Sequence, residues 1–210
     1  MPQSIDFYYD VVCPYAYLAS TRIGALAQDT GAELNYRPIL LGGVLKSVGS
    51  PTIPMDSMPV AKAKHNAQDM HRWADLWGVE LKLPMAHPRR SVHAMRCILA
   101  AEDALLKTTT AFFRAYWIDG LDITDTSVCI DVLNQLSLDG KAISEKAQSD
   151  AIKQDLRTRT QEAVDLGIFG VPSYIVNGEL FWGQDRLHFV SEAANGTKTS
   201  QLHPWGDKHA

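Results

Sequence analysis

Strand-like stretches of apolar residues lie at the two ends of the chain. Residues 4–12 (SIDFYYDVV) are rich in Ile, Phe, Tyr and Val and predict a buried strand. Pro14 suits the first turn of a helix, whose apolar positions continue until Gly31. Residues 32–40 (AELNYRPIL) predict a second strand. The order strand, helix, strand is typical of a β-α-β unit with parallel strands.

The middle of the chain has helical periodicity. Residues 40–59 are rich in glycine and proline and predict an irregular loop. From there to about residue 167 no segment predicts a strand. Asp125 is a suitable N-cap for one of the helices. Five segments fit the spacing of a helix: residues 60–78, 91–106, 108–120, 125–136 and 144–167.

Strand signals return near the C-terminal end. Two short strands, VPSYIV and ELFWG, flank Asn177-Gly178, a pair that strongly favours a hairpin. Residues 184–194 (QDRLHFVSEAA) predict a last helix with Asp185 near its N-cap.

The two strand-rich ends must share one sheet, because two strands cannot form a stable sheet alone. The prediction is therefore an α/β, thioredoxin-like fold (β-α-β … β-β-α) with an inserted all-helical domain. The expected parts are a discontinuous thioredoxin-like domain at 1–45 and 168–200, a helical insert at 46–167, and a mobile tail at 201–210.

Composition narrows the function classes. Of 210 residues, 46% are hydrophobic and 21% charged, as is ordinary for a globular protein. The formal net charge of −4 argues against nucleic acid as the main partner. No apolar run is long enough to cross a membrane, and the N-terminus lacks signal-peptide features. We therefore expect a cytoplasmic protein with no membrane partner.

The three cysteines differ in their setting. Cys97 and Cys129 fall on apolar helix faces and are expected in the core. Cys13 lies between a strand and a helix, with Ala16 where a dithiol enzyme has its second cysteine. Backbone N–H groups and the dipole at a helix N-terminus favour thiolates. Cys13 is then either reactive itself or a neighbour of a bound thiolate, and a core cysteine at a strand end stays a third interpretation.

Two further motifs bear on ligand binding. In FGVPS (residues 169–173) a proline at the start of a strand can be cis, which turns the backbone groups of the preceding residue outward toward a peptide-like ligand. His65 and His71 lie six positions apart and do not share a helix face, so no metal site is predicted.

Four segments together resemble a known family. They are DFYYDVVCPYAYLA, RWADLWG, FFRAYWIDGLDITD and FGVPSYIVNGELFWGQDRL. From about residue 5 to residue 190, the chain resembles the 2-hydroxychromene-2-carboxylate isomerases and the kappa-class glutathione transferases. Both belong to the DsbA-like branch of the thioredoxin superfamily. The resemblance implies an enzyme that binds glutathione as cofactor, usually as a homodimer.

The resemblance also implies roles for particular residues. The family commonly has serine in place of Cys13, where the hydroxyl donates a hydrogen bond to the glutathione thiolate. Val171 and a cis-proline at Pro172 bind the cysteinyl backbone of glutathione. Asp185, beside Gln184 and Arg186, lies near the γ-glutamyl end.

Three basic residues are candidates for contact with the substrate. The resemblance implies that Lys62 faces the substrate side. Arg89 and Arg90 stand where relatives often have smaller or amide side chains. They either bind a substrate carboxylate through bidentate contacts or form a solvated helix start.

Three function hypotheses follow. The first is a glutathione-dependent isomerase of an aromatic, pyruvate-type substrate, in which the thiolate adds reversibly to a conjugated double bond. A kappa-like transferase acting on a small electrophile shares the first half of that cycle. The second is a monothiol oxidoreductase in which Cys13 forms a mixed disulfide with glutathione. The third is a non-catalytic thioredoxin-like binding module.

Overall fold

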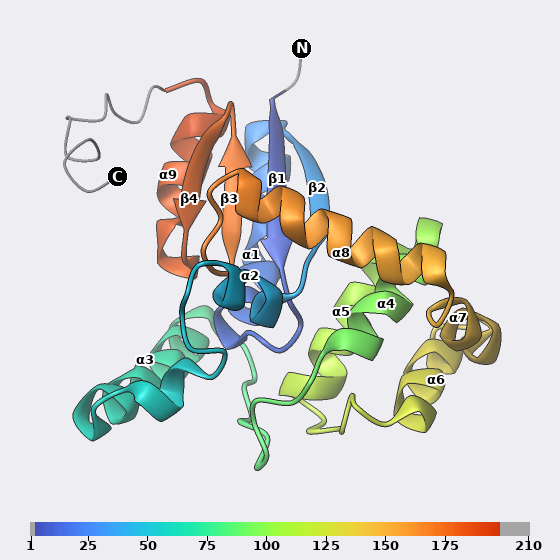
Figure 1. Ribbon diagram of the computed structural model, residues 1–210. Helices are drawn as coiled ribbons and strands as arrows, with labels where there is room; N and C mark the ends of the chain where they lie inside the picture. Colours follow the sequence, from blue (N-terminus) through green and yellow to red (C-terminus); the bar gives the residue numbers. More distant parts are fainter. Residues whose placement is uncertain (1–2, 198–210) are drawn as a thin grey trace.

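A mixed sheet lies at the centre of the computed structural model, which describes residues 3–197. In the described part its strand order is β2-β1-β3-β4 (Figure 1). β1 pairs in parallel with β2 and antiparallel with β3, and β3 pairs antiparallel with β4. The bounds are Ser4–Tyr9 (β1), Glu33–Pro38 (β2), Ser173–Val176 (β3) and Glu179–Trp182 (β4). The two ends of the chain thus build one sheet, and the predicted thioredoxin-like fold is confirmed.

The first helix and the hairpin follow local sequence signals. α1 (Pro14–Thr30) begins with the predicted proline and ends at Gly31, which has a φ of 66°. Asn177 and Gly178 have φ values of 54° and 81°, the left-handed conformations of a type I′ hairpin turn. β1 ends at Tyr9 rather than at residue 12. The three residues after it belong to the loop that leads to Cys13.

Helices cover both faces of the sheet (Figure 1). α1 and α9 (Leu187–Ala194) contact each other and the strands on one face, whereas α8 (Asp150–Asp165) packs across β2 on the other. Alternating side chains of β1 follow this division. The ring of Tyr9 packs against Phe113 on the α1 side, and Tyr8 points toward α8.

The remaining helices lie beyond one end of the strands. α3 (Val60–Trp77) lies to one side in Figure 1, and α4 (Val92–Ala100), α5 (Leu105–Trp117), α6 (Thr126–Gln135) and α7 (Gly140–Lys146) form a group on the other. As predicted, Asp125 caps α6, accepting a hydrogen bond from the Ser127 backbone N–H. Trp117 Nε1 donates to the carbonyl of Val11 at 2.8 Å, which fixes α5 against the loop before Cys13.

The prediction of an irregular loop at 40–59 was wrong in its first part. α2 (Leu41–Ser47) forms there, followed by a 3₁₀ turn at Pro54–Ser57. The helix is stabilised by tertiary contacts: the Leu41 N–H donates to buried Asp10, and α2 packs on α8. A Cβ on Gly43 would come within 3.0 Å of Thr160 Cγ2, so a glycine allows this close approach.

Three helix boundaries also differ from the prediction. The segment 91–106 breaks after Ala100, where Glu102 has a φ of 47°, and the next helix begins early, at Leu105. The segment 144–167 forms two helices because Ser149 caps a new one, accepting from the Ile152 N–H. The last helix begins at Leu187 rather than at residue 184, after a 3₁₀ turn, and its N-cap is Arg186, directly after Asp185, so the prediction that Asp185 lies near the N-cap is confirmed.

Two further predictions concern membrane-spanning segments and the C-terminal tail. In residues 3–197 no helix has both the length and the apolar character that a bilayer crossing requires. The tail expected at 201–210 lies outside the described residues.

Candidate active site

Cys13 is the N-cap of α1 and faces the loop before β3. Its backbone is extended (φ −89°, ψ 120°), and Pro14 follows as the first helical residue. The Cys13 thiol donates a hydrogen bond to the carbonyl of Val171 at 3.2 Å, and only 5% of the residue is exposed. The structure therefore joins two motifs that lie far apart in the sequence.

The Cys13 thiol is a neutral group. Burial raises its pKa to about 12, and this outweighs the lowering by hydrogen bonds from the backbone N–H groups of Ala16 and Tyr15. A protonated thiol donates a hydrogen bond but is a poor nucleophile. Of the interpretations left open by the sequence, this favours a Cys13 that stands beside the thiolate of a ligand.

The loop before β3 offers backbone groups to the same site. The peptide bond between Val171 and Pro172 is cis. The Pro172 carbonyl accepts a hydrogen bond from the Gly183 N–H at 2.9 Å. The Val171 N–H has no hydrogen-bond partner within residues 3–197, while the Val171 carbonyl accepts from Cys13. One free donor and one weakly engaged acceptor are what an extended peptide-like ligand pairs with.

The segment Gln184–Arg186 reaches the same end of α1. It forms a 3₁₀ turn (η3) that contacts α1. Asp185 forms an ion pair with Arg186, and both side chains are partly exposed, whereas Gln184 is buried. Asp185 also acts electrostatically on Tyr15, in the first turn of α1. The structure thus brings Asp185 close to the first turn of α1, with Gln184 and Arg186 beside it in the same 3₁₀ turn.

Tyr15 links the thiol to α3. Burial, followed by the charges of Asp69, Cys13 and Asp185, raises the pKa of Tyr15 to about 12. Lys62 is exposed on α3 and precedes Asp69 by seven positions, so the two residues share one face of that helix. Lys62 thus lies about two turns from Asp69 on that face, and its role on the substrate side stays a prediction.

The two arginines behave differently. Arg89 forms an ion pair with Asp122 at 3.3 Å, and its backbone N–H donates to the hydroxyl of Tyr116 at 3.1 Å. Arg90 is exposed just before α4. Within the described chain neither side chain forms a hydrogen bond or ion pair with Cys13 or Val171, so their substrate role stays a prediction.

Two residues near Cys13 were missed by sequence reasoning. Asp10 is 1% exposed and accepts hydrogen bonds from the Val12 N–H, the Leu41 N–H and the Ser91 hydroxyl. Its place directly after a buried strand was the available signal. Tyr174, on β3, is fully buried with an unpaired hydroxyl. Nothing in its local sequence marks it.

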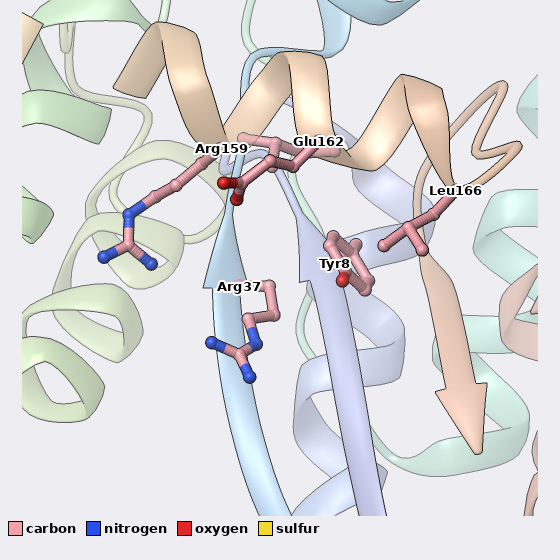
Figure 2. A pocket seen from close by; sticks show the side chains of 6 residues that line it. Tyr8, Arg37, Arg159, Glu162 and Leu166 are labelled. Carbon is pink, nitrogen blue, oxygen red and sulfur yellow. The ribbon is translucent and has the colours of Figure 1, made fainter. Parts of the chain in front are cut away.

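A hollow of about 220 Å³ lies on the opposite face of the sheet, under α8 (Figure 2). Arg37 and Arg159 line it, together with Tyr8 and Glu162. Both arginines already have acidic partners, Asp6 and Asp155. No group of three or more His, Cys, Asp or Glu side chains suited to a metal occurs among residues 3–197. We therefore regard the α1 side as the candidate site.

A mixed sheet whose first helix begins opposite a cis-proline loop defines a thioredoxin-like protein. Comparisons with known proteins agree. The model of the DSBA-like thioredoxin domain matches residues 4–195. A 2-hydroxychromene-2-carboxylate isomerase of Sphingobium xenophagum is 30% identical over 190 residues, which cover 90% of this chain and 97% of the relative. Glutathione S-transferase kappa 1 of Caenorhabditis elegans is 27% identical over 204 residues, covering 90% of each chain.

Solved structures give the same result. The structure of a 2-hydroxychromene-2-carboxylate isomerase matches with a TM-score of 0.78 and 28% identity, over 90% of this chain and 93% of that one. The protein therefore belongs to the DsbA-like thioredoxin family, among the relatives of the 2-hydroxychromene-2-carboxylate isomerases and kappa-class glutathione transferases. The predicted family is confirmed.

Proposed function

We propose that the protein is a glutathione-dependent isomerase of an aromatic, pyruvate-type substrate similar to 2-hydroxychromene-2-carboxylate. The observation that carries the proposal is the neutral Cys13 thiol at the N-terminus of α1, opposite Val171 and without a second cysteine at position 16. Relatives named as isomerases of that substrate match about 90% of the chain. Both observations favour an enzyme in which the reactive sulfur comes from a ligand.

The residues present fit glutathione. The Val171 N–H is unpaired within the described chain, and the Val171 carbonyl accepts a hydrogen bond only from the Cys13 thiol. These two groups would pair with the cysteinyl backbone of glutathione. Asp185 and Arg186, with Gln184 beside them, would hold the ammonium and carboxylate of the γ-glutamyl end. When bound, glutathione supplies a thiolate that adds reversibly to a conjugated double bond, so that this bond rotates before the thiolate leaves.

The protein's own residues would keep the glutathione sulfur deprotonated and oriented toward the substrate. The thiol of Cys13 donates a hydrogen bond toward the ligand sulfur, and the first N–H groups of α1 add their dipole. Because Cys13 has a pKa of about 12, it keeps its proton and does not compete as a nucleophile. Lys62, on α3, and Arg89 or Arg90 would attract the substrate carboxylate. The resulting orientation lowers the entropic barrier of the addition.

Counting thiols during turnover tests the proposal. An isomerase returns its glutathione, so product forms while the total thiol concentration stays constant. A kappa-like transferase, the second candidate, consumes one thiol for each conjugated electrophile such as a chloronitrobenzene. Isomerisation of 2-hydroxychromene-2-carboxylate that proceeds equally well without glutathione would overturn the proposal. Absence of binding at millimolar glutathione in a calorimetric titration would favour a non-catalytic module instead.

The homodimer and the cytoplasmic location stay predictions. Relatives named as kappa-class transferases support glutathione as the partner but say nothing of assembly in this chain. Light scattering coupled to size exclusion would give the mass, and cell fractionation the location. A monomer with full activity would show that the site is complete in one chain.

A further inference from the structure

The hydroxyl of Tyr174 is buried without a hydrogen-bond partner. Tyr174 is 0% exposed, and its hydroxyl is one of three buried side-chain N or O atoms left unpaired in the described residues. A buried hydroxyl without a partner destabilises the folded protein, and phenylalanine would fill the same space without that cost. The Tyr174 hydroxyl is therefore available to pair with a group that changes position when a ligand binds.

The strand register places Tyr174 on the sheet face that carries the candidate site. Tyr174 follows Pro172 by two positions and lies opposite Phe7 of β1, against whose ring its own ring stacks at 5.6 Å. That face of the sheet is the one covered by α1, because Tyr9 on the same face packs with Phe113, which also contacts Tyr17 of α1. Tyr174 interacts electrostatically with two groups, Cys13 and Asp185. These are the expected neighbours of the ligand sulfur and of the γ-glutamyl end.

The hydroxyl stays protonated in this setting. Burial raises the pKa of Tyr174 well above its ordinary value of 10.0, and the negative charge of Asp185 raises it further. The group is thus available as a donor at every physiological pH. It donates to no group within residues 3–197, and the Cys13 thiol is turned toward Val171.

We propose that Tyr174 is a positioning residue that acts through Cys13. Once a ligand amide occupies the Val171 carbonyl, the Cys13 S–H turns to the ligand sulfur, and the sulfur of Cys13 accepts a hydrogen bond from Tyr174. A donor that itself accepts a hydrogen bond is polarised and becomes a stronger donor. The relay compensates for the weak hydrogen-bond donor strength of the Cys13 thiol. This inference rests on the proposed binding of glutathione.

Calorimetry with glutathione on four proteins tests the inference: wild type, Tyr174→Phe, Cys13→Ala and the double variant. Tyr36→Phe is the matched control, since Tyr36 is on the same sheet face but on the edge strand β2. We expect Tyr174→Phe to weaken glutathione binding about 3- to 10-fold, the usual effect of losing one hydrogen bond. The same change should have no effect when Cys13 is already alanine. Tyr36→Phe should bind like wild type.

Two further measurements separate this role from a merely structural one. Thiolate absorbance of bound glutathione across pH should show a higher thiol pKa in Tyr174→Phe, while its Tm rises because an unpaired buried hydroxyl is gone. Unchanged affinity and unchanged thiol pKa in Tyr174→Phe, with wild type binding glutathione, would overturn the relay alone. An equal loss of affinity with and without Cys13 would also overturn it. Failure of the wild type to bind glutathione would overturn the proposed function and the relay with it.

Discussion

The Cys13 thiol and the Val171 carbonyl lie 3.2 Å apart, although 158 positions separate the two residues. Each is a group that a glutathione molecule would engage, and in the unliganded protein they satisfy each other. The bond also connects the start of α1 to the loop before β3. Ligand binding at this place must therefore exchange one weak internal hydrogen bond for stronger external ones.

Cys13→Ser is expected to keep or increase isomerase activity while abolishing any exchange with glutathione disulfide. Serine donates a stronger hydrogen bond than a thiol, and it cannot form a mixed disulfide. Cys13→Ala, the control, should weaken glutathione binding about 3- to 10-fold because the donor is gone. Steady-state kinetics and calorimetry measure both effects. Complete loss of activity in the serine variant would show that Cys13 acts covalently.

The three cysteines should react slowly in the folded protein. Cys13 is 5% exposed, and Cys97 and Cys129 are fully buried. With a pKa of about 12, Cys13 has so little thiolate at pH 8 that labelling should be at least ~100-fold slower than for free glutathione. An aromatic disulfide reagent should then count three thiols only after denaturation. Rapid labelling of one thiol that Cys13→Ser removes would contradict the neutral state described above.

Asp10→Asn should lower the free energy of unfolding by about 1–3 kcal/mol. The carboxylate of Asp10 accepts three hydrogen bonds, from the β1–α1 loop, from Leu41 and from Ser91. An asparagine has one acceptor oxygen, and its NH₂ group would face a donor. Urea unfolding measures the loss. Asp29→Asn, on the exposed side of α1, is the control and should change stability by less than about 0.5 kcal/mol. An equal loss in both variants would contradict the role of Asp10.

The ends of the chain were predictable because their signals are local. Pro14, Gly31 and the Asn177-Gly178 turn each require a particular backbone conformation, and they fix the strand–helix–strand unit and the hairpin. Cys13 and Val171 come together because both motifs end at the same edge of the shared sheet. Their proximity therefore follows from topology alone.

The parts that escaped prediction depend on tertiary contacts. α2 contains Gly42 and Gly43, poor helix formers, and is held by Asp10 and Thr160, far away in the sequence. The break at Ala101–Glu102 lies among good helix formers, so periodicity gives no sign of it. Tyr174 looks like any strand aromatic until the structure shows that its hydroxyl is buried and unpaired.

His87→Gln should remove part of the acid sensitivity of the fold. Burial lowers the pKa of His87 from 6.5 to about 4, where its ring packs on Trp117 and shares a hydrogen bond with Tyr116. Between those two values the unfolded chain takes up a proton that the folded protein refuses, so the wild type loses stability as the pH falls from 6.5 to 4. In His87→Gln this contribution is absent, and unfolding free energies measured from pH 7 to pH 4 should fall less steeply. The exposed His71→Gln is the control, and a slope unchanged by His87→Gln would contradict the prediction.

Gly183→Ala should weaken glutathione binding by displacing Asp185. Gly183 has a φ of 105°, which side chains rarely adopt, and a Cβ there would come within 2.6 Å of Asp185 Oδ1. Gly167→Ala is the matched control, because Gly167 has a φ of 85° but nothing within 4 Å of its Cβ. Both variants should unfold at lower temperature from backbone strain, and only Gly183→Ala should also lose affinity, by about tenfold if one charge-assisted hydrogen bond is lost. Calorimetry at equal folded fraction separates the two effects. Full affinity in Gly183→Ala would show that Asp185 does not hold the ligand, and the γ-glutamyl end would then need another partner.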